Sequence, residues 1–427
     1  MEFIKIKSDK LVIFFLSMMP LALAAGPAVI ETFSFLILIS FFLLKKKFLF
    51  EKKEYLILIL FFFLILSSLI SEFKIHSIQS SFFLLRVILL FYVFKFFFKY
   101  YKDEIIEKTL FFLIITFGIL VFDVLFQYTF NHSFFGTEKI SDGRMSIHFR
   151  EESIIGAYLS RTLPIFIGLW LYKFKIFKIQ TNLLFFFISL LVLISTLLSN
   201  ERAAGVLLVS FILMIFSLSN LNSVTKILLI FIFSFFVGFM IYANKDLNQR
   251  FIKETFQELY GQNDANFVNP DNKISEDIKI EEFLKEKNKS KIFLFSTAHE
   301  AHIRTAFNMF QNNFVFGVGP NNFRNLCSKD RYGIYPERGC STHPHHILSQ
   351  ILAETGITGF IFYLITISFI SINLLRHFFL KNLNYSKVCM YSFYFLLLIP
   401  LLPSGNIFSN WYLYSILLPF FYLNFIR

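Results

Sequence analysis

Three histidines stand within four residues of one another in the stretch 317–359, where Gly, Pro, Asn, Arg, Cys and His crowd together. Pro344 prevents a regular helix through the motif HPHH and restricts His343, so His345 and His346 fall near the start of the next helix. A histidine at such a position can be a neutral base at physiological pH. We therefore predict that His345 and His346 are catalytic and that His343 contacts substrate. The alternative is an interfacial polar cap.

Two arginines are candidates for binding an anionic group. Arg202 lies in LLSNERAAGV, in a short hairpin between apolar stretches that has no topological need for a cation. The alternative is a surface pair with Glu201 or a snorkelling side chain. Arg304 lies on a helix expected to begin near Ser296, where Glu300 offers a simple salt bridge at i, i+4 spacing. We predict that Arg202 is catalytic and that Arg304 contacts substrate.

The turn GVGPNNF ends this helix, because Gly and Pro break helices. We expect Asn321 and Asn322 in this turn to contact substrate. Cys327 and Cys340 flank the segment 328–339, so a disulfide is plausible in an oxidising compartment, and two unrelated thiols are the alternative. Their spacing to the histidines matches no zinc motif, and we expect neither a metal nor another cofactor.

The elements that must position these residues are apolar helices. Hydrophobic residues make up 56% of the 427 residues and charged residues 16%, which predicts an all-α, polytopic integral membrane protein. We expect about 12 transmembrane helices. Their approximate ranges are 10–26, 28–44, 55–70, 78–98, 109–128, 153–172, 183–199, 203–219, 226–243, 347–372, 387–402 and 411–426.

The distribution of Lys and Arg predicts the orientation. With both termini inside, the inner segments hold most of these residues and the short outer loops hold few, as the positive-inside rule requires. The net charge of +12 therefore reflects topology, with no sign of nucleic-acid binding. The chain divides into helices with short loops (1–243), a large outer loop carrying surface helices (244–346) and the last three helices (347–427). Within this loop we expect the charge-rich segment 264–291 to be mobile or loosely helical.

Ionisable side chains inside the spans are the remaining unusual feature. Arg86, Asp123 and Arg161 fall within the expected helices, where a charge is costly unless it faces a partner or a cavity. Asp123 could pair with either arginine. A structural role for these three residues and a role in substrate binding are equally supported.

With these residues in view, the chain resembles the O-antigen ligase family, which also includes O-antigen polymerases and some protein O-oligosaccharyltransferases. Its signature is similar to His345-His346, nine intervening residues and Gly356-x-x-Gly359, with a second histidine where an amide or hydroxyl residue is usual. GVGPNNF resembles the family's Gly-rich turn. Arg202 and Arg304 match its periplasmic arginines. Arg144, in GRMSIHF, resembles an Arg-x-x-Gly-x-Phe pattern and would contact substrate, although Ile147 replaces the glycine.

The resemblance implies a metal-independent glycosyltransferase of the bacterial inner membrane with a periplasmic active site. The donor would be a glycan on undecaprenyl pyrophosphate, and the acceptor a lipid A–core sugar or another glycan. His345 would be the base, while Arg202 and Arg304 would bind the pyrophosphate through bidentate contacts. Single inversion at the anomeric carbon is the family expectation.

Two alternative functions use the same chemistry with another acceptor, and a third is transport without glycan transfer. An O-antigen polymerase would use a second lipid-linked glycan as acceptor, and a protein O-oligosaccharyltransferase would use a protein Ser or Thr. A flippase or transporter of lipid-linked sugars would place its functional charges along a central pore and show internal symmetry. The unusual residues here gather at the outer surface, which favours the enzymes over the transporter.

Overall fold

The computed structural model describes residues 2–48, 51, 54–140, 143–146, 154–174, 179–259, 297–332, 339–381 and 384–423. Regular structure within these ranges is helical, apart from an isolated β-bridge between His132 and Glu138. Three of the described helices are long and apolar enough to cross a bilayer, namely α4 (Lys74–Phe130), α8 (Ser223–Ala243) and α14 (Ile347–Leu380). The protein is thus a helical membrane protein, and the number of crossings stays a prediction.

The other expected spans also coincide with helices. These are α1 (Glu2–Ala25), α2 (Pro27–Leu43), α3 (Tyr55–Ile70), α5 (Ile155–Lys173), α6 (Ile179–Leu198), α7 (Arg202–Leu218), α15 (Tyr385–Leu398) and α16 (Asn410–Leu423). The expected spans 78–98 and 109–128 follow each other without an intervening loop. Both belong to α4, which is broken only at Tyr101 (φ −132°, ψ 31°). α4 therefore consists of two helices that meet at this kink, and each of them holds one of the expected spans.

The ionisable residues inside the helices find other partners than expected. Arg86 forms an ion pair with Glu31 of α2, with 2.5 Å between Nη1 and Oε2. Asp123 accepts a hydrogen bond of 2.7 Å from the backbone of Phe134. The guanidinium of Arg161 lies 4.6 Å from the ring centroid of Tyr412. The contacts of Arg86 and Arg161 described here are thus with Glu31 and Tyr412, and Asp123 contacts the loop that follows α4.

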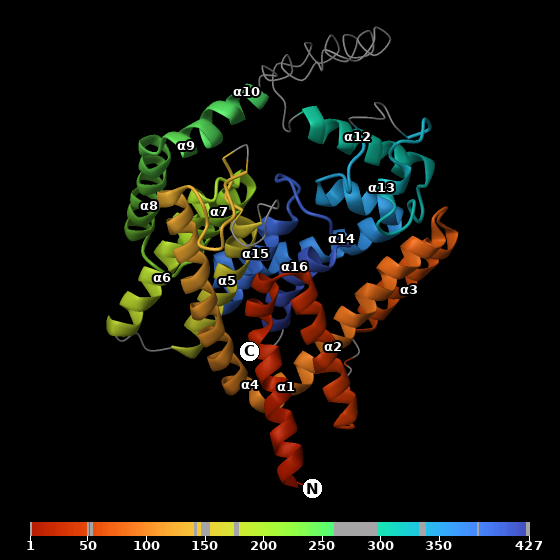
Figure 1. Cartoon of the computed structure of the whole chain (residues 1–427), viewed down its shortest axis with the longest axis horizontal. Helices are drawn as coiled ribbons and strands as arrows, with labels where there is room; N and C mark the ends of the chain where they lie inside the picture. The colour runs from red at the N-terminus through yellow and green to blue at the C-terminus, as the bar shows by residue number, and fades with distance from the viewer. Residues whose placement is uncertain are drawn as a thin grey trace.

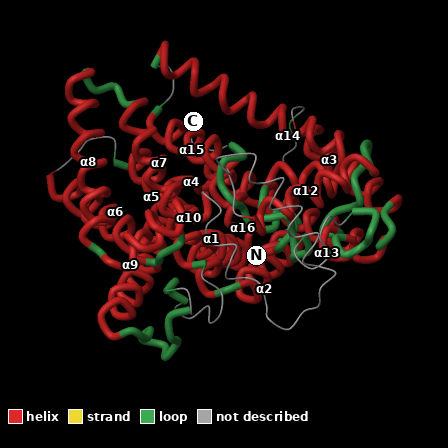
Figure 2. Tube along the Cα trace, turned by 90° about the horizontal axis from the view of Figure 1, so that it is seen from above, coloured by secondary structure: helices red, strands yellow, loops and turns green. Residues whose placement is uncertain are grey.

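Short helices form a layer at the end of the molecule away from the N-terminus (Figure 1). They are α9 (Lys245–Leu247), the π-helix η2 (Asn248–Glu254), α10 (Thr255–Leu259), α12 (Thr297–Asn312) and α13 (Phe323–Leu326). The charge-rich segment 264–291 lies outside the described residues. Figure 2 shows α12 beside α14, against which its buried face packs through Ala306 and Met309. Of the candidate site residues, Arg304 lies on α12, and Asn322 and Cys327 flank α13.

Apolar surface elsewhere matches a membrane setting. Of the side chains of α8, only Val237 is buried, and Phe231, Phe235 and Phe239 are exposed. Such a continuous apolar face is unfavourable in water and favourable against lipid.

Candidate active site

The Gly-rich turn meets a kink in α14 at the centre of the candidate site. Gly356 has a φ of 64°, and it breaks the helix one turn after Ala353. The backbone of the turn pairs with this break: Val318 donates to the carbonyl of Ala353 (2.8 Å) and Ile357 donates to that of Phe314 (2.8 Å). The two glycine-containing motifs of the sequence are therefore one structural unit.

Asn321 and Asn322 hold the shape of this turn. Asn322 is fully buried and its amide nitrogen donates to the carbonyl of Val318 (3.1 Å), so we assign it to the turn and no longer to substrate contact. The side-chain oxygen of Asn321 accepts hydrogen bonds from Asn406 (2.9 Å) and Arg324 (3.1 Å). Both asparagines that we expected to contact substrate are thus committed to contacts within the protein.

A buried polar chain continues from Asn406 into α14. The amide of Gln350 donates to Asn406 Oδ1 (2.7 Å) and to Glu354 Oε2 (2.9 Å). Glu354 in turn accepts the backbone N–H of Phe323 at 2.8 Å. Because the three polar side chains are buried, removing any one leaves another without its partner. This chain fixes the loop 399–409 to the Gly-rich turn.

His346 caps α14. Its Nδ1 accepts the backbone N–H of Ser349 (3.3 Å) and lies 2.8 Å from that residue's hydroxyl, while Nε2 donates to the carbonyl of Pro400 (3.2 Å). A carbonyl can only accept, so the proton resides on Nε2. Nδ1 therefore caps the start of α14, in the way an N-cap side chain does, while Nε2 binds the loop 399–409.

His343 is bound in the same tautomer. Its Nε2 donates to the carbonyl of Ser404 (3.1 Å) and its Nδ1 accepts from the hydroxyl of Thr342 (2.9 Å). The ring is buried. Burial lowers the pKa of His343 to about 4, although the hydrogen bond that it donates to the carbonyl of Ser404 acts in the opposite direction.

His345 lies at the centre of four imidazoles. Its backbone is left-handed (φ 55°), and its carbonyl accepts the N–H of Ser404 at 2.9 Å. Ring centroids lie 4.0 Å away for His343, 5.4 Å for His299 and 5.5 Å for His302. Burial, helped by the neighbouring imidazoles, lowers the pKa of His345 to about 3, so the ring is neutral. This turn thus gathers neutral rings around one partly exposed histidine.

His299 and His302 on α12 were missed by the sequence interpretation. Their i, i+3 spacing places them on one helix face, and this was the available signal. That face opposes the HPHH turn, although more than 40 residues separate the segments in the sequence. Burial lowers the pKa of His299.

Arg202 lies at the start of α7 and reaches the short helices above it. Its guanidinium donates to Thr255 Oγ1 (3.2 Å) and to Glu258 Oε1 (2.8 Å). Thr255 and Glu258 both lie in α10, which directly follows the π-helix η2 in the chain. Short π-helical distortions are frequent at functional sites. The charges of Arg202 and Glu258 both act on the pKa of His299, which links this arginine to the histidine cluster.

Glu201 does not pair with its neighbour Arg202, as one alternative had it. Its carboxylate accepts the backbone N–H groups of Gly156 (2.6 Å) and Ala157 (2.9 Å), and it caps the start of α5. Burial raises the pKa of Glu201 to about 7, although these two amides, Arg161 and Arg144 act in the opposite direction. Arg144 therefore lies on this side of the site, whereas His148 and Arg150 fall outside the described residues.

Arg304 lines a cavity of about 400 Å³ between α12 and α14. It pairs with Glu300 at 2.7 Å, as the i, i+4 spacing allowed. The same cavity is lined by the apolar side chains of Ile303, Phe307 and Leu352. A cation above an apolar wall suits an anionic headgroup joined to a hydrocarbon chain.

Cys327 and Cys340 form a disulfide in the structure, with 5.0 Å between their Cα atoms. Cys327 packs in a small core with Met309 of α12, Phe323 of α13 and Ala353 of α14. The disulfide therefore links the segment that precedes the HPHH turn to the small core formed by α12, α13 and α14.

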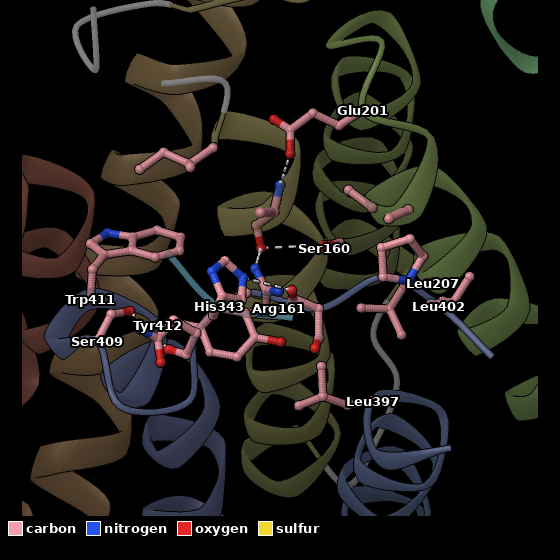
Figure 3. Close-up of a pocket in the computed structure, with 18 of the residues that line it drawn as sticks. Ser160, Arg161, Glu201, Leu207, His343, Leu397, Leu402, Ser409, Trp411 and Tyr412 are labelled. Atoms are coloured by element: carbon pink, nitrogen blue, oxygen red, sulfur yellow. Dashed lines mark hydrogen bonds between the residues drawn. The ribbon is translucent and has the colours of Figure 1, made fainter. Parts of the chain in front are cut away.

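A larger cavity, of about 640 Å³, opens beside His343 (Figure 3). Arg161 and Glu201 lie on one wall, and Ser404, Trp411 and Tyr412 on another. Among the residues that the structure describes, no three His, Cys, Asp or Glu side chains are arranged to hold a metal ion.

Residues 185–364 match the family model described as O-antigen ligase. The matched range contains Arg202, Arg304, the HPHH turn and Gly359. A search of curated proteins found no match. The family match agrees with the motifs that the structure joins into one site, and residues 185–364 of the chain are similar to the O-antigen ligase family.

Proposed function

We propose that the protein transfers a glycan from undecaprenyl pyrophosphate to a lipid A–core sugar. The reaction takes place at the periplasmic face of the bacterial inner membrane, with both termini in the cytoplasm. The family match supports glycan transfer, and the clustering of the unusual residues at one end of the molecule supports an active site on one membrane face.

The observation that carries this proposal is the difference between His345 and its two neighbours. His343 and His346 each use both ring nitrogens in hydrogen bonds. His345 bonds only through Nε2, to the hydroxyl of Ser341 at 2.9 Å, and its Nδ1 accepts no hydrogen bond from the described residues. It is therefore the histidine of the motif that is available as a base.

The proposed step conserves atoms and charge. His345 removes the proton from the acceptor hydroxyl as that oxygen attacks the anomeric carbon of the donor. The bond from this carbon to the pyrophosphate oxygen breaks, and the electron pair leaves with undecaprenyl pyrophosphate. Attack from the face opposite the leaving group inverts the anomeric configuration.

The basicity of His345 depends on the donor in this scheme. A histidine with a pKa of about 3 is neutral but accepts protons weakly. A pyrophosphate placed nearby favours the charged imidazolium and raises this pKa. The base thus becomes effective once the donor is bound.

The pyrophosphate would lie on the side of Arg202 and Arg304. Arginine's planar fork matches phosphate oxygens and neutralises the charge that develops on the leaving group. The cavity beside Arg304 has apolar walls for the first isoprenoid units. Arg144 adds positive charge near Glu201, on the side of the larger cavity.

The test is a deletion strain complemented with the wild-type protein or with His345→Ala. Surface polysaccharide is analysed on gels, and lipid-linked intermediates are extracted in parallel. The proposal expects long glycans on undecaprenyl pyrophosphate and bare lipid A–core in the deletion and variant strains. Single repeat units on the lipid or on the core would instead identify a polymerase, and unchanged lipopolysaccharide with glycosylation lost from proteins would identify a protein O-oligosaccharyltransferase.

A further inference from the structure

The larger cavity contains polar atoms that lack partners. Arg161 is only 8% exposed, and its Nε makes no hydrogen bond within the described residues. The same holds for the hydroxyl of Tyr412, which is 5% exposed, and for the hydroxyl of Ser404. A buried polar group without a partner costs about 1–3 kcal/mol. Three such groups on side chains that line one cavity favour a polar ligand; the three atoms are closed off from solvent in the structure, so they would meet the ligand after these side chains turn toward the cavity.

The aromatic side chains of the cavity favour a sugar. The indole N–H of Trp411 donates to the carbonyl of Leu23 at 3.0 Å, which anchors this ring at the cavity wall. Tyr412 stacks on Arg161, as Figure 3 shows. Aromatic faces pack against the C–H face of a pyranose while hydroxyls and amides bind its edges.

Charge decides between the two substrates of the proposed reaction. Arg161 and Arg324 line the cavity together with the carboxylate of Glu201, so its charged lining side chains leave a single net positive charge when Glu201 is ionised. A pyrophosphate requires more cationic partners than this. A sugar with a single acidic substituent is matched by the free donor groups of Arg161 without displacing Glu201 from α5.

The cavity also lies next to the proposed base. His343 lines it, and the ring centroid of His343 is 4.0 Å from that of His345. Arg304 lines the other cavity, together with Ser349, and the two cavities share none of their lining residues. We propose that the cavity of Arg161, Ser404 and Tyr412 binds the acceptor sugar and that Arg161 recognises a carboxylate or phosphate group on it. This inference rests on the proposed function.

The test measures binding without turnover. Trp170 and Trp411 are the two tryptophans of the chain, so Trp170→Phe leaves Trp411 as the only fluorescent reporter. The purified full-length protein in detergent is titrated with glucuronate, glucose 6-phosphate, glucose and inorganic pyrophosphate. We expect one of the two acidic sugars to bind at least about tenfold more tightly than glucose, because the buried guanidinium of Arg161 would bind its acidic group. Which acid is preferred separates a carboxylate from a phosphate.

Three variants test which side chain binds which ligand. Arg161→Gln should abolish the preference for the acidic sugar. Tyr412→Phe should weaken sugar binding about fivefold without lowering Tm, since the hydroxyl has no protein partner to lose. Arg202→Gln should leave sugar binding intact and weaken pyrophosphate binding.

Other outcomes overturn the inference. Equal binding of glucose and both acids, no response of Trp411 to any sugar, or pyrophosphate binding that is lost in Arg161→Gln would each do so. If Arg161→Gln does not fold, Tyr412→Phe still decides, because unchanged sugar affinity in that variant removes the site. Sugar binding as expected together with full transfer by His345→Ala would refute the proposed base and leave the cavity assignment intact.

Discussion

Gly317 and Gly356 pack backbone against backbone. A Cβ atom on Gly317 would lie 2.5 Å from the carbonyl carbon of Glu354, and one on Gly356 would lie 2.6 Å from the backbone nitrogen of Gly317. Both residues also have positive φ, 68° and 64°. The first glycine of the Gly-x-x-Gly signature is thus explained by its contact with the Gly-rich turn.

Gly317→Ala and Gly356→Ala should each destabilise the protein by more than the roughly 1–2 kcal/mol of a left-handed residue, because the new methyl group meets backbone that cannot move aside. Tm in detergent measures this. Gly238→Ala is the matched control, since a Cβ there has no atom within 4 Å and the residue is helical. An equal loss of stability in all three variants would contradict the packing argument.

His345 and His346 should respond differently to substitution. His345→Ala should lower the transfer rate about 10²–10⁴-fold with unchanged Tm, because it removes the general base. His346→Asn should keep activity, since asparagine also accepts a hydrogen bond at an N-cap, whereas His346→Ala should cost about 1 kcal/mol of stability. Loss of transfer in His346→Asn as severe as in His345→Ala would reverse the two roles.

We expect Glu258 to compete with the proposed donor for Arg202. Because the two side chains form an ion pair at 2.8 Å, Glu258→Gln should release Arg202 for the pyrophosphate and lower the KM for the lipid-linked donor. Arg202→Ala should abolish transfer. The control is Glu254→Gln, one turn away, whose partner is Arg250. A KM that rises in Glu258→Gln would show that the carboxylate orients Arg202 for catalysis.

The histidine cluster should make the protein sensitive to acid. The pKa of His343 is about 4 and that of His345 about 3 in the folded protein, against an ordinary value of 6.5. At a pH between the folded and the ordinary pKa, each of these histidines is protonated in the unfolded chain and neutral in the folded chain. The unfolded chain therefore binds more protons, and the free energy of unfolding falls as pH drops below about 6.5. The double variant His343→Gln/His345→Gln should show a smaller fall in Tm between pH 7.5 and 5.

His132→Gln, at an exposed turn away from the cluster, is the control for this measurement. If it reduces the acid sensitivity as much as the double variant does, the effect does not originate in the cluster.

The helices and the motifs could be predicted from the sequence, because long apolar stretches and the breaks made by Gly and Pro are local signals. The approach of His299 to His345 could not, since it depends on how α12 packs against α14. The burial of Asn322 could not be predicted for a related reason: its type and position in a polar turn are typical of a ligand contact, and only the packed structure shows that its side chain is buried. The position of Tyr412 at the larger cavity could not be predicted either, because a single tyrosine in an apolar helix is usually part of the hydrophobic core.

The carboxylate of Glu201 caps α5 and also borders the larger cavity. With a pKa of about 7, it carries a proton in roughly half of the molecules at neutral pH. An acidic sugar beside it would draw further protons from solution, so the heat of association should change with the ionisation enthalpy of the buffer. Recognition of the acceptor would then be coupled to the acidity of the surroundings through a side chain that takes no part in the chemical step.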